Sequence, residues 1–257
     1  MSIIDRTMER RKVWDIVILL LVFVASVSFP IGSITSDVDA IIGTKCGILG
    51  AFILFAILFI HFTGIAHVFQ GKIKHKNAFL LAPLFLVAFC NLFFFVVFQP
   101  GSLGKTQWNL TLFLAVLLSL LTAVSEELVF RFVIQKNLII QSKMLKILIA
   151  TSLFALCHIL TVISGWNLAK PATWNWFDLS MIAYTFFIGF CLGVLYEYTN
   201  NILLPIGFHF IFNFINDNLF YVETWTLPYL FNCIGFALFG IAYICLFYFV
   251  FTKREER

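Results

Sequence analysis

Residues 110–131 read LTLFLAVLLSLLTAVSEELVFR, and this stretch decides the fold class. No residue from Leu110 to Ser125 is charged, so the run is long and apolar enough to enter a bilayer. Glu126, Glu127 and Arg131 then bring three ionisable groups into the same segment. Because an ionisable side chain inside a membrane is costly, such a residue marks a functional site by default. The stretch therefore predicts a membrane helix that carries a polar site.

The composition of the whole chain agrees with a membrane protein. Of the 257 residues, 61% are hydrophobic and 12% are charged, whereas about 25% of the residues in a soluble domain are charged. We expect an all-α, polytopic membrane protein in which residues 1–257 form a single integral membrane domain. The formal net charge of +4 comes from clusters at the chain ends and in the expected loops. This distribution orients a membrane protein and gives no reason to expect a nucleic-acid partner.

About eight transmembrane helices of roughly 17–25 residues can be drawn along the chain. We expect the first to be an uncleaved helix rather than a signal peptide. The expected spans are Val13–Phe29, Cys46–Phe69, Ala78–Phe98, Leu110–Ile134, Ile147–Ile163, Phe177–Tyr196, Ile202–Phe220 and Tyr229–Phe251.

Basic residues predict how these spans are oriented. They precede the first span and follow the second, fourth and eighth, whereas the alternate loops carry only Lys45, Lys105 and Lys170. The positive-inside rule therefore places both termini in the cytoplasm. An even number of spans agrees with this orientation.

The three charges at the end of the fourth span differ in their expected surroundings. Side chains four residues apart share a helix face, whereas neighbouring side chains diverge by about 100°. Glu127 and Arg131 are thus expected to form a structural ion pair, and Glu126 is expected to be a carboxylate without a partner on its own helix. The alternative interpretation is that all three belong to a buried packing network.

Two further spans carry polar residues that could act together with Glu126. The fifth contains Phe154-Ala-Leu-Cys-His158, where a lone histidine is as readily an interior residue as a functional one. The seventh contains His209-Phe-Ile-Phe-Asn213, in which the imidazole and the amide face the same way. Such a pair could hold a developing oxyanion, or a metal ion with a water molecule.

The expected depths of these groups agree. With a rise of 1.5 Å per residue, Glu126 lies about 15 Å from the inner end of its helix, His158 about 18 Å and His209 about 12 Å. Antiparallel spans therefore bring all three to a similar depth in the cytoplasmic half of the membrane. We expect them to meet at one site.

Three motifs resemble those of the CAAX protease and bacteriocin-processing family of intramembrane endopeptidases, which also contains the type II CAAX prenyl endopeptidases. EExxxR is found at Glu126–Arg131, FxxxH at Phe154–His158 and HxxxN at His209–Asn213. The resemblance covers about residues 110–218, which we take as the catalytic core helices. It implies helices arranged around an intramembrane catalytic cavity that is open towards the cytoplasm.

The resemblance also implies roles for individual residues. Glu126 and His158 would activate a water molecule, while His209 and Asn213 would polarise the scissile carbonyl and hold its oxyanion. Glu127 and Arg131 would support the site. Two possibilities for the cofactor stay open: a zinc ion held by Glu126, His158 and His209, or water activation without a metal.

The expected partners are a peptide or protein substrate and the lipid bilayer. The amino-acid composition of the chain suggests that this bilayer is a bacterial cell membrane. The resemblance implies a pheromone or bacteriocin precursor, or a CAAX-type peptide, as substrate. A non-catalytic bacteriocin immunity or peptide-binding protein is the alternative. A transporter, in which the same residues would form an ion path, lacks the repeated halves with broken helices that such proteins show.

Overall fold

Every regular element that the computed structural model describes is a helix, as the sequence predicts. The described residues are 3–29, 36–65, 110–169 and 176–214. The elements are α1 (Ile3–Val27), α2 (Val38–Thr63), α4 (Leu110–Glu127), the π-helical segment η4 (Leu128–Gln135), α5 (Lys143–Ala169), α6 (Trp176–Thr199) and α7 (Leu203–Phe214).

The expected count of eight membrane helices is not confirmed, because six helices are seen within the described part of the chain. They correspond to six of the expected spans, and the other two, Ala78–Phe98 and Tyr229–Phe251, lie outside the described residues. Three segments there are long and apolar enough to cross a membrane: α2, the continuous α4–η4 rod, and Ile182–Thr199 of α6. These helices support an integral membrane protein.

The first helix begins well before the expected span. We placed its start at Val13, but α1 already begins at Ile3 and includes the basic cluster at residues 10–12. Arginine, lysine and glutamate are good helix formers, so the helix continues where the apolar run stops. The first residue of the hydrophobic span was thus a poor guide to the first residue of the helix.

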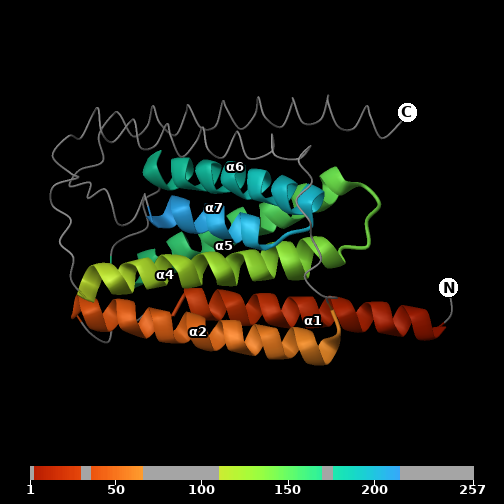
Figure 1. The fold of residues 1–257 in the computed structure, drawn as a ribbon, viewed down its shortest axis with the longest axis horizontal. Helices are drawn as coiled ribbons and strands as arrows, with labels where there is room; N and C mark the ends of the chain where they lie inside the picture. The colour runs from red at the N-terminus through yellow and green to blue at the C-terminus, as the bar shows by residue number, and fades with distance from the viewer. Residues whose placement is uncertain (1–2, 30–35, 66–109, 170–175, 215–257) are drawn as a thin grey trace.

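The helices lie side by side (Figure 1), and η4 contacts α1, α4, α5 and α6. The α1–α2 pair packs on one side of α4, while α7 packs on another side of α4 and α5 packs against α6. All eight residues of η4 are buried, against α1, α5 and α6. The end of the charged motif is therefore the most enclosed part of the described bundle.

Aromatic rings connect the outer helices to this centre. Phe52 of α2 contacts Phe23 of α1, with ring centroids 5.4 Å apart, and Phe23 meets Phe130 of η4 edge to face at 5.6 Å. Phe130 in turn meets Phe154 of α5 at 5.1 Å. Each such pair contributes about 0.5–1.5 kcal/mol beyond the burial of its area. This row of rings fixes α1, α2 and α5 around η4.

Large apolar side chains also face outwards, as contact with lipid requires. Trp14, Leu54, Phe62 and Phe113 are among the exposed ones, and Phe62 is 81% exposed. In water these surfaces would be costly. Their exposure on α1, α2 and α4 agrees with a bilayer around the bundle.

A tight turn places α7 next to α4. Asn200 ends α6 in the left-handed conformation, with φ of 50°, which asparagine tolerates better than most residues. The backbone N–H of Leu203 then donates to Oδ1 of Asn201 at 3.0 Å, which caps the start of α7. Since the connection is so short, α7 turns back along α6 and packs against α4.

Candidate active site

The helix that carries the two glutamates changes its geometry directly after them. We predicted one continuous α-helix over Leu110–Ile134, but α4 ends at Glu127 and eight π-helical residues follow. Such segments are rare and frequently lie at functional sites. The spacing of apolar residues does not predict a π-helical segment. Its wider turn depends on packing against several neighbouring helices rather than on local helix propensity.

The predicted ion pair between Glu127 and Arg131 is confirmed. Nε of Arg131 donates to Oε2 of Glu127 at 3.0 Å, and both side chains are completely buried. A buried charge is stable only when it is paired and hydrogen-bonded. Glu127 is therefore anchored by its own helix.

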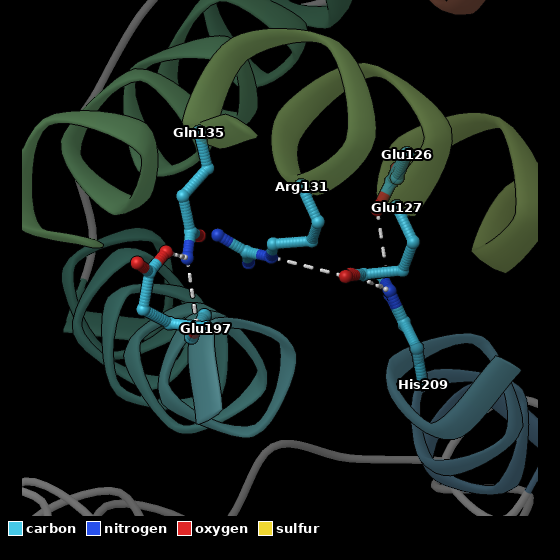
Figure 2. Close-up of polar contacts among 7 residues, drawn as sticks. Glu126, Glu127, Arg131, Gln135, Glu197 and His209 are labelled. Atoms are coloured by element: carbon cyan, nitrogen blue, oxygen red, sulfur yellow. Dashed lines mark hydrogen bonds and ion pairs between the residues drawn. The ribbon is translucent and has the colours of Figure 1, made fainter. Parts of the chain in front are cut away.

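The second oxygen of Glu127 reaches a different helix, which the sequence did not predict. Nδ1 of His209 on α7 lies 2.9 Å from Oε1 of Glu127 (Figure 2). An ionised carboxylate only accepts hydrogen bonds, so Nδ1 carries a proton that it donates to Glu127. Glu127 thus joins Arg131 and His209, and it is more than the partner of Arg131.

Glu126 faces the other nitrogen of the same imidazole. Its Oε2 lies 3.3 Å from Nε2 of His209, within ion-pair range, and the side chain is 6% exposed. The geometry is not that of a hydrogen bond, and among the described residues Oε2 of Glu126 has no hydrogen-bond partner. Glu126 therefore has a neighbour on α7. The imidazole of His209 lies between two adjacent carboxylates.

His158 reaches this cluster through an aromatic ring. Its Nδ1 donates to the backbone carbonyl of Phe154 at 3.0 Å, which leaves Nε2 as the nitrogen available to other groups. The ring of Phe154 meets His158 edge to face at 4.7 Å and His209 at 5.9 Å. Phe154 therefore lies between the two histidines, a role that the spacing of the motif alone did not reveal.

Asn213 lies near the cluster because it is on the same helix as His209. It lies one turn after His209 on α7 and is partly buried. Its predicted role as an oxyanion donor stays a prediction. The polar residues 216–218 lie outside the described part of the chain.

The structure adds two polar residues to the motif. Nε2 of Gln135 donates to the carbonyl of Gly193 at 2.9 Å and to Oε2 of Glu197 at 3.1 Å. A signal for Gln135 was present, because it continues the four-residue spacing of Glu127 and Arg131. Glu197 was visible as a charged residue at the end of an apolar helix.

A metal ion would need a set of ligands that the described residues do not bring together. No three side chains of His, Cys, Asp or Glu come close enough within these residues to hold one. Glu126, His158 and His209, which would be the ligands if a zinc ion were bound, are thus not assembled as a three-ligand site in this arrangement. The contacts of His209 are instead with Glu126 and Glu127.

Comparison with known proteins agrees with the motifs. Residues 107–215 match the sequence model of a family described as type II CAAX prenyl endopeptidase Rce1-like. No curated protein and no solved structure matches the chain significantly. The matched segment begins just before α4 and ends just after α7, so it contains all the candidate residues.

Proposed function

Because the chain belongs, through residues 107–215, to the CAAX protease and bacteriocin-processing family, we propose that it is an intramembrane endopeptidase that uses Glu126, His158, His209 and Asn213. The observation that carries the proposal is the approach of Glu126 to His209. A carboxylate and an imidazole from two helices lie 3.3 Å apart in a buried setting. Such pairs move protons in hydrolytic enzymes.

In the proposed reaction, a water molecule attacks the carbonyl carbon of the scissile peptide bond. Glu126 takes a proton from this water, and His158 orients it through Nε2. The tetrahedral oxyanion accepts hydrogen bonds from Asn213 and from Nε2–H of His209, which is in the imidazolium form that two neighbouring carboxylates favour. Such an interaction is worth about 2.7–4 kcal/mol per donor in comparable sites. The C–N bond then breaks and Glu126 returns its proton to the leaving amine. The products are a carboxylic acid and an amine, which exchange a proton to give a carboxylate and an ammonium group.

The second glutamate supports this cycle. Glu127 holds the Nδ1–H of His209, so Nε2 is the nitrogen that faces Glu126 and the substrate. Arg131 compensates the buried charge of Glu127. Because Oε2 of Glu126 lies 3.3 Å from Nε2 of His209, the substrate carbonyl would displace this contact when it reaches Nε2.

The substrate class follows from the family and from the location of the site. A membrane-associated peptide can reach a buried site inside a helical bundle laterally or from the membrane surface. A CAAX-type peptide is the first candidate, because the matched family is described as a prenyl endopeptidase family. An exported pheromone or bacteriocin precursor is the second candidate.

The proposed location is a bacterial cell membrane, with both termini in the cytoplasm. The distribution of the basic residues supports this orientation. With the basic residues Lys136, Lys143 and Lys146 at the inner face, the substrate would be cut near the cytoplasmic surface.

The test is cleavage by the full-length protein, purified and reconstituted in lipid nanodiscs. Prenylated and unprenylated CAAX peptides and leader peptides are incubated with the parent, and the products are identified by mass spectrometry. We expect cleavage by the parent and a loss of about 10²-fold or more with Glu126→Gln and with His158→Ala.

Thr151→Val serves as the folded control, because it removes a buried hydroxyl on α5 that has no hydrogen bond within the described residues. If Glu126→Gln and His158→Ala both cleave as the parent does, the enzymatic proposal is wrong. If the folded parent binds the peptides without cutting any of them, a peptide-binding or immunity protein is the better description.

A further inference from the structure

The loop between η4 and α5 has an exposed apolar tip. Residues 138–142 of this loop are not helical, and the side chain of Ile139 is 72% exposed. Leu145, in the first turn of α5, is 45% exposed. Apolar surface in contact with water costs about 25 cal/mol per Å² relative to burial. The tip is therefore stabilised by any covering phase that is less polar than water.

Hydrogen bonds at both ends of the loop hold the tip in place. Nδ2 of Asn137 donates to the carbonyl of Val133 at 2.7 Å, which satisfies a carbonyl in the last turn of η4. At the other end, Oγ of Ser142 accepts from the backbone N–H of Leu145 at 3.3 Å and caps α5. Ile139 is thus presented outwards by a loop whose two ends are fixed.

Two lysines flank the tip, and their ammonium groups lie over aromatic rings. Nζ of Lys136 is 5.0 Å from the ring centroid of Phe132, and Nζ of Lys143 is 5.2 Å from that of Tyr198. Such cation–π contacts keep the positive charge beside the bundle. Both lysines are partly buried, so each covers apolar surface with its stem, an arrangement that is favoured at membrane interfaces.

The loop lies at the end of the bundle where other interfacial residues are found. Figure 1 shows it, in bright green, at the same end as the start of α1. Arg11 and Lys12 of α1 are exposed, and Trp14, which follows them closely, is 65% exposed. Tryptophan and basic residues are typical of the boundary between a bilayer and water. The positive-inside rule assigns this end to the cytoplasm, where anionic lipids give the leaflet a negative surface.

We propose that the η4–α5 loop is a binding surface for anionic phospholipids, in which Ile139 and Leu145 enter the headgroup region of the inner leaflet and Lys136 and Lys143 bind phosphate oxygens. A phospholipid surface supplies both the anionic group and the apolar surroundings that the loop requires. Because the loop continues directly from η4, this contact also fixes the depth of the buried motif below the membrane surface. The inference does not depend on peptidase activity.

The lipid dependence of stability tests the two lysines. The full-length protein is reconstituted in nanodiscs of phosphatidylcholine, with or without phosphatidylglycerol, and the midpoint of thermal unfolding is measured in both. We expect a higher midpoint with phosphatidylglycerol, and Lys136→Gln/Lys143→Gln should lose more than half of this rise, because it removes both charges from the anionic surface. Inorganic phosphate added to the phosphatidylcholine nanodiscs should not reproduce the rise.

The matched control for the lysines is Lys45→Gln. Lys45 is exposed on α2, nearer the other end of the bundle. This variant removes one positive charge without touching the loop, so it should keep the full rise. If the parent shows no rise, if the double variant keeps all of it, or if inorganic phosphate reproduces it, the inference is overturned.

Photocrosslinking identifies what covers the tip. A benzoylphenylalanine side chain is introduced at residue 139, the nanodiscs are irradiated, and the products are analysed by mass spectrometry. We expect an adduct with phospholipid. The same side chain at residue 113 is the positive control, because Phe113 is 63% exposed on the apolar α4.

The adduct at residue 139 separates the other possible occupants from lipid. A covalent dimer would identify a second copy of the chain as the partner. No adduct at residue 139, with a lipid adduct at residue 113, would place the tip in water. Either result overturns the inference, and neither bears on cleavage, so the proposed function is tested separately.

Discussion

Nδ1 of His209 lies 2.9 Å from Oε1 of Glu127, so the second glutamate of the motif links two helices and is not simply the partner of Arg131. The two neighbouring glutamates therefore have different surroundings. Glu127 is completely buried between a guanidinium and an imidazole, and both of its oxygens are hydrogen-bonded. Glu126 has an oxygen without a hydrogen bond among the described residues.

This difference predicts opposite effects of the same substitution at adjacent positions. Glu127→Gln leaves the buried Arg131 without a counter-charge and should lower the free energy of unfolding by about 3–5 kcal/mol. Glu126→Gln removes no hydrogen bond and should leave the stability unchanged or slightly increased, while cleavage is lost. Unfolding of both purified variants in the same detergent measures the contrast. An equal loss of stability in the two variants would contradict this assignment.

The pairing of Glu127 with Arg131 was predictable because it depends only on helix periodicity. The sequence also predicted that motif residues from different spans would meet, and Glu126 does meet His209. The contact of His209 with Glu127 was not predictable, since it depends on the rotation of α7 relative to α4. The π-helical segment and the hydrogen bond from Gln135 to Glu197 likewise depend on packing between distant parts of the chain. Periodicity identifies a shared face within a helix, but not which faces of two helices meet.

Thr151 provides a prediction about stability alone. Its side chain on α5 is completely buried, and Oγ1 has no hydrogen bond within the described residues. An unsatisfied buried hydroxyl costs about 1–3 kcal/mol, and valine has nearly the same shape. Thr151→Val should therefore raise the midpoint of thermal unfolding, while cleavage stays unchanged. A clear decrease of the midpoint would show that the hydroxyl has a partner in the folded protein.

Phe154 should matter for activity more than its burial alone suggests. Its ring contacts both histidines and lies under Arg131, whose Cζ is 5.4 Å from the ring centroid. Phe154→Leu keeps most of the apolar volume but removes these contacts, so kcat should fall about tenfold as the imidazoles lose their fixed orientation.

The matched control for Phe154 is Phe52→Leu. Phe52 is similarly buried at 3% exposure but contacts Phe23 rather than a histidine. Both variants should lose a comparable stability of about 1–2 kcal/mol, and only Phe154→Leu should lose kcat. Equal kcat values at equal stability would mean that the ring only fills space.

Gly189 allows Phe154 to occupy its position. A Cβ atom at residue 189 would lie 2.8 Å from Cδ1 of Phe154 and 3.4 Å from Nη2 of Arg131. Gly189→Ala must therefore displace the ring, and overpacking of this kind costs about 1–3 kcal/mol. Gly50→Ala on α2, where nothing lies within 4 Å, should instead stabilise the helix by about 0.5–1 kcal/mol.

The double variant Gly189→Ala/Phe154→Leu identifies the cause of this loss. Leucine has no ring atom to meet the new methyl group, so the double variant should be less destabilised than the sum of the two single variants, by about 0.5–3 kcal/mol. The free energies of unfolding of the parent, the single variants and the double variant give this coupling directly. If the two losses simply add, residue 189 does not act through the ring of Phe154.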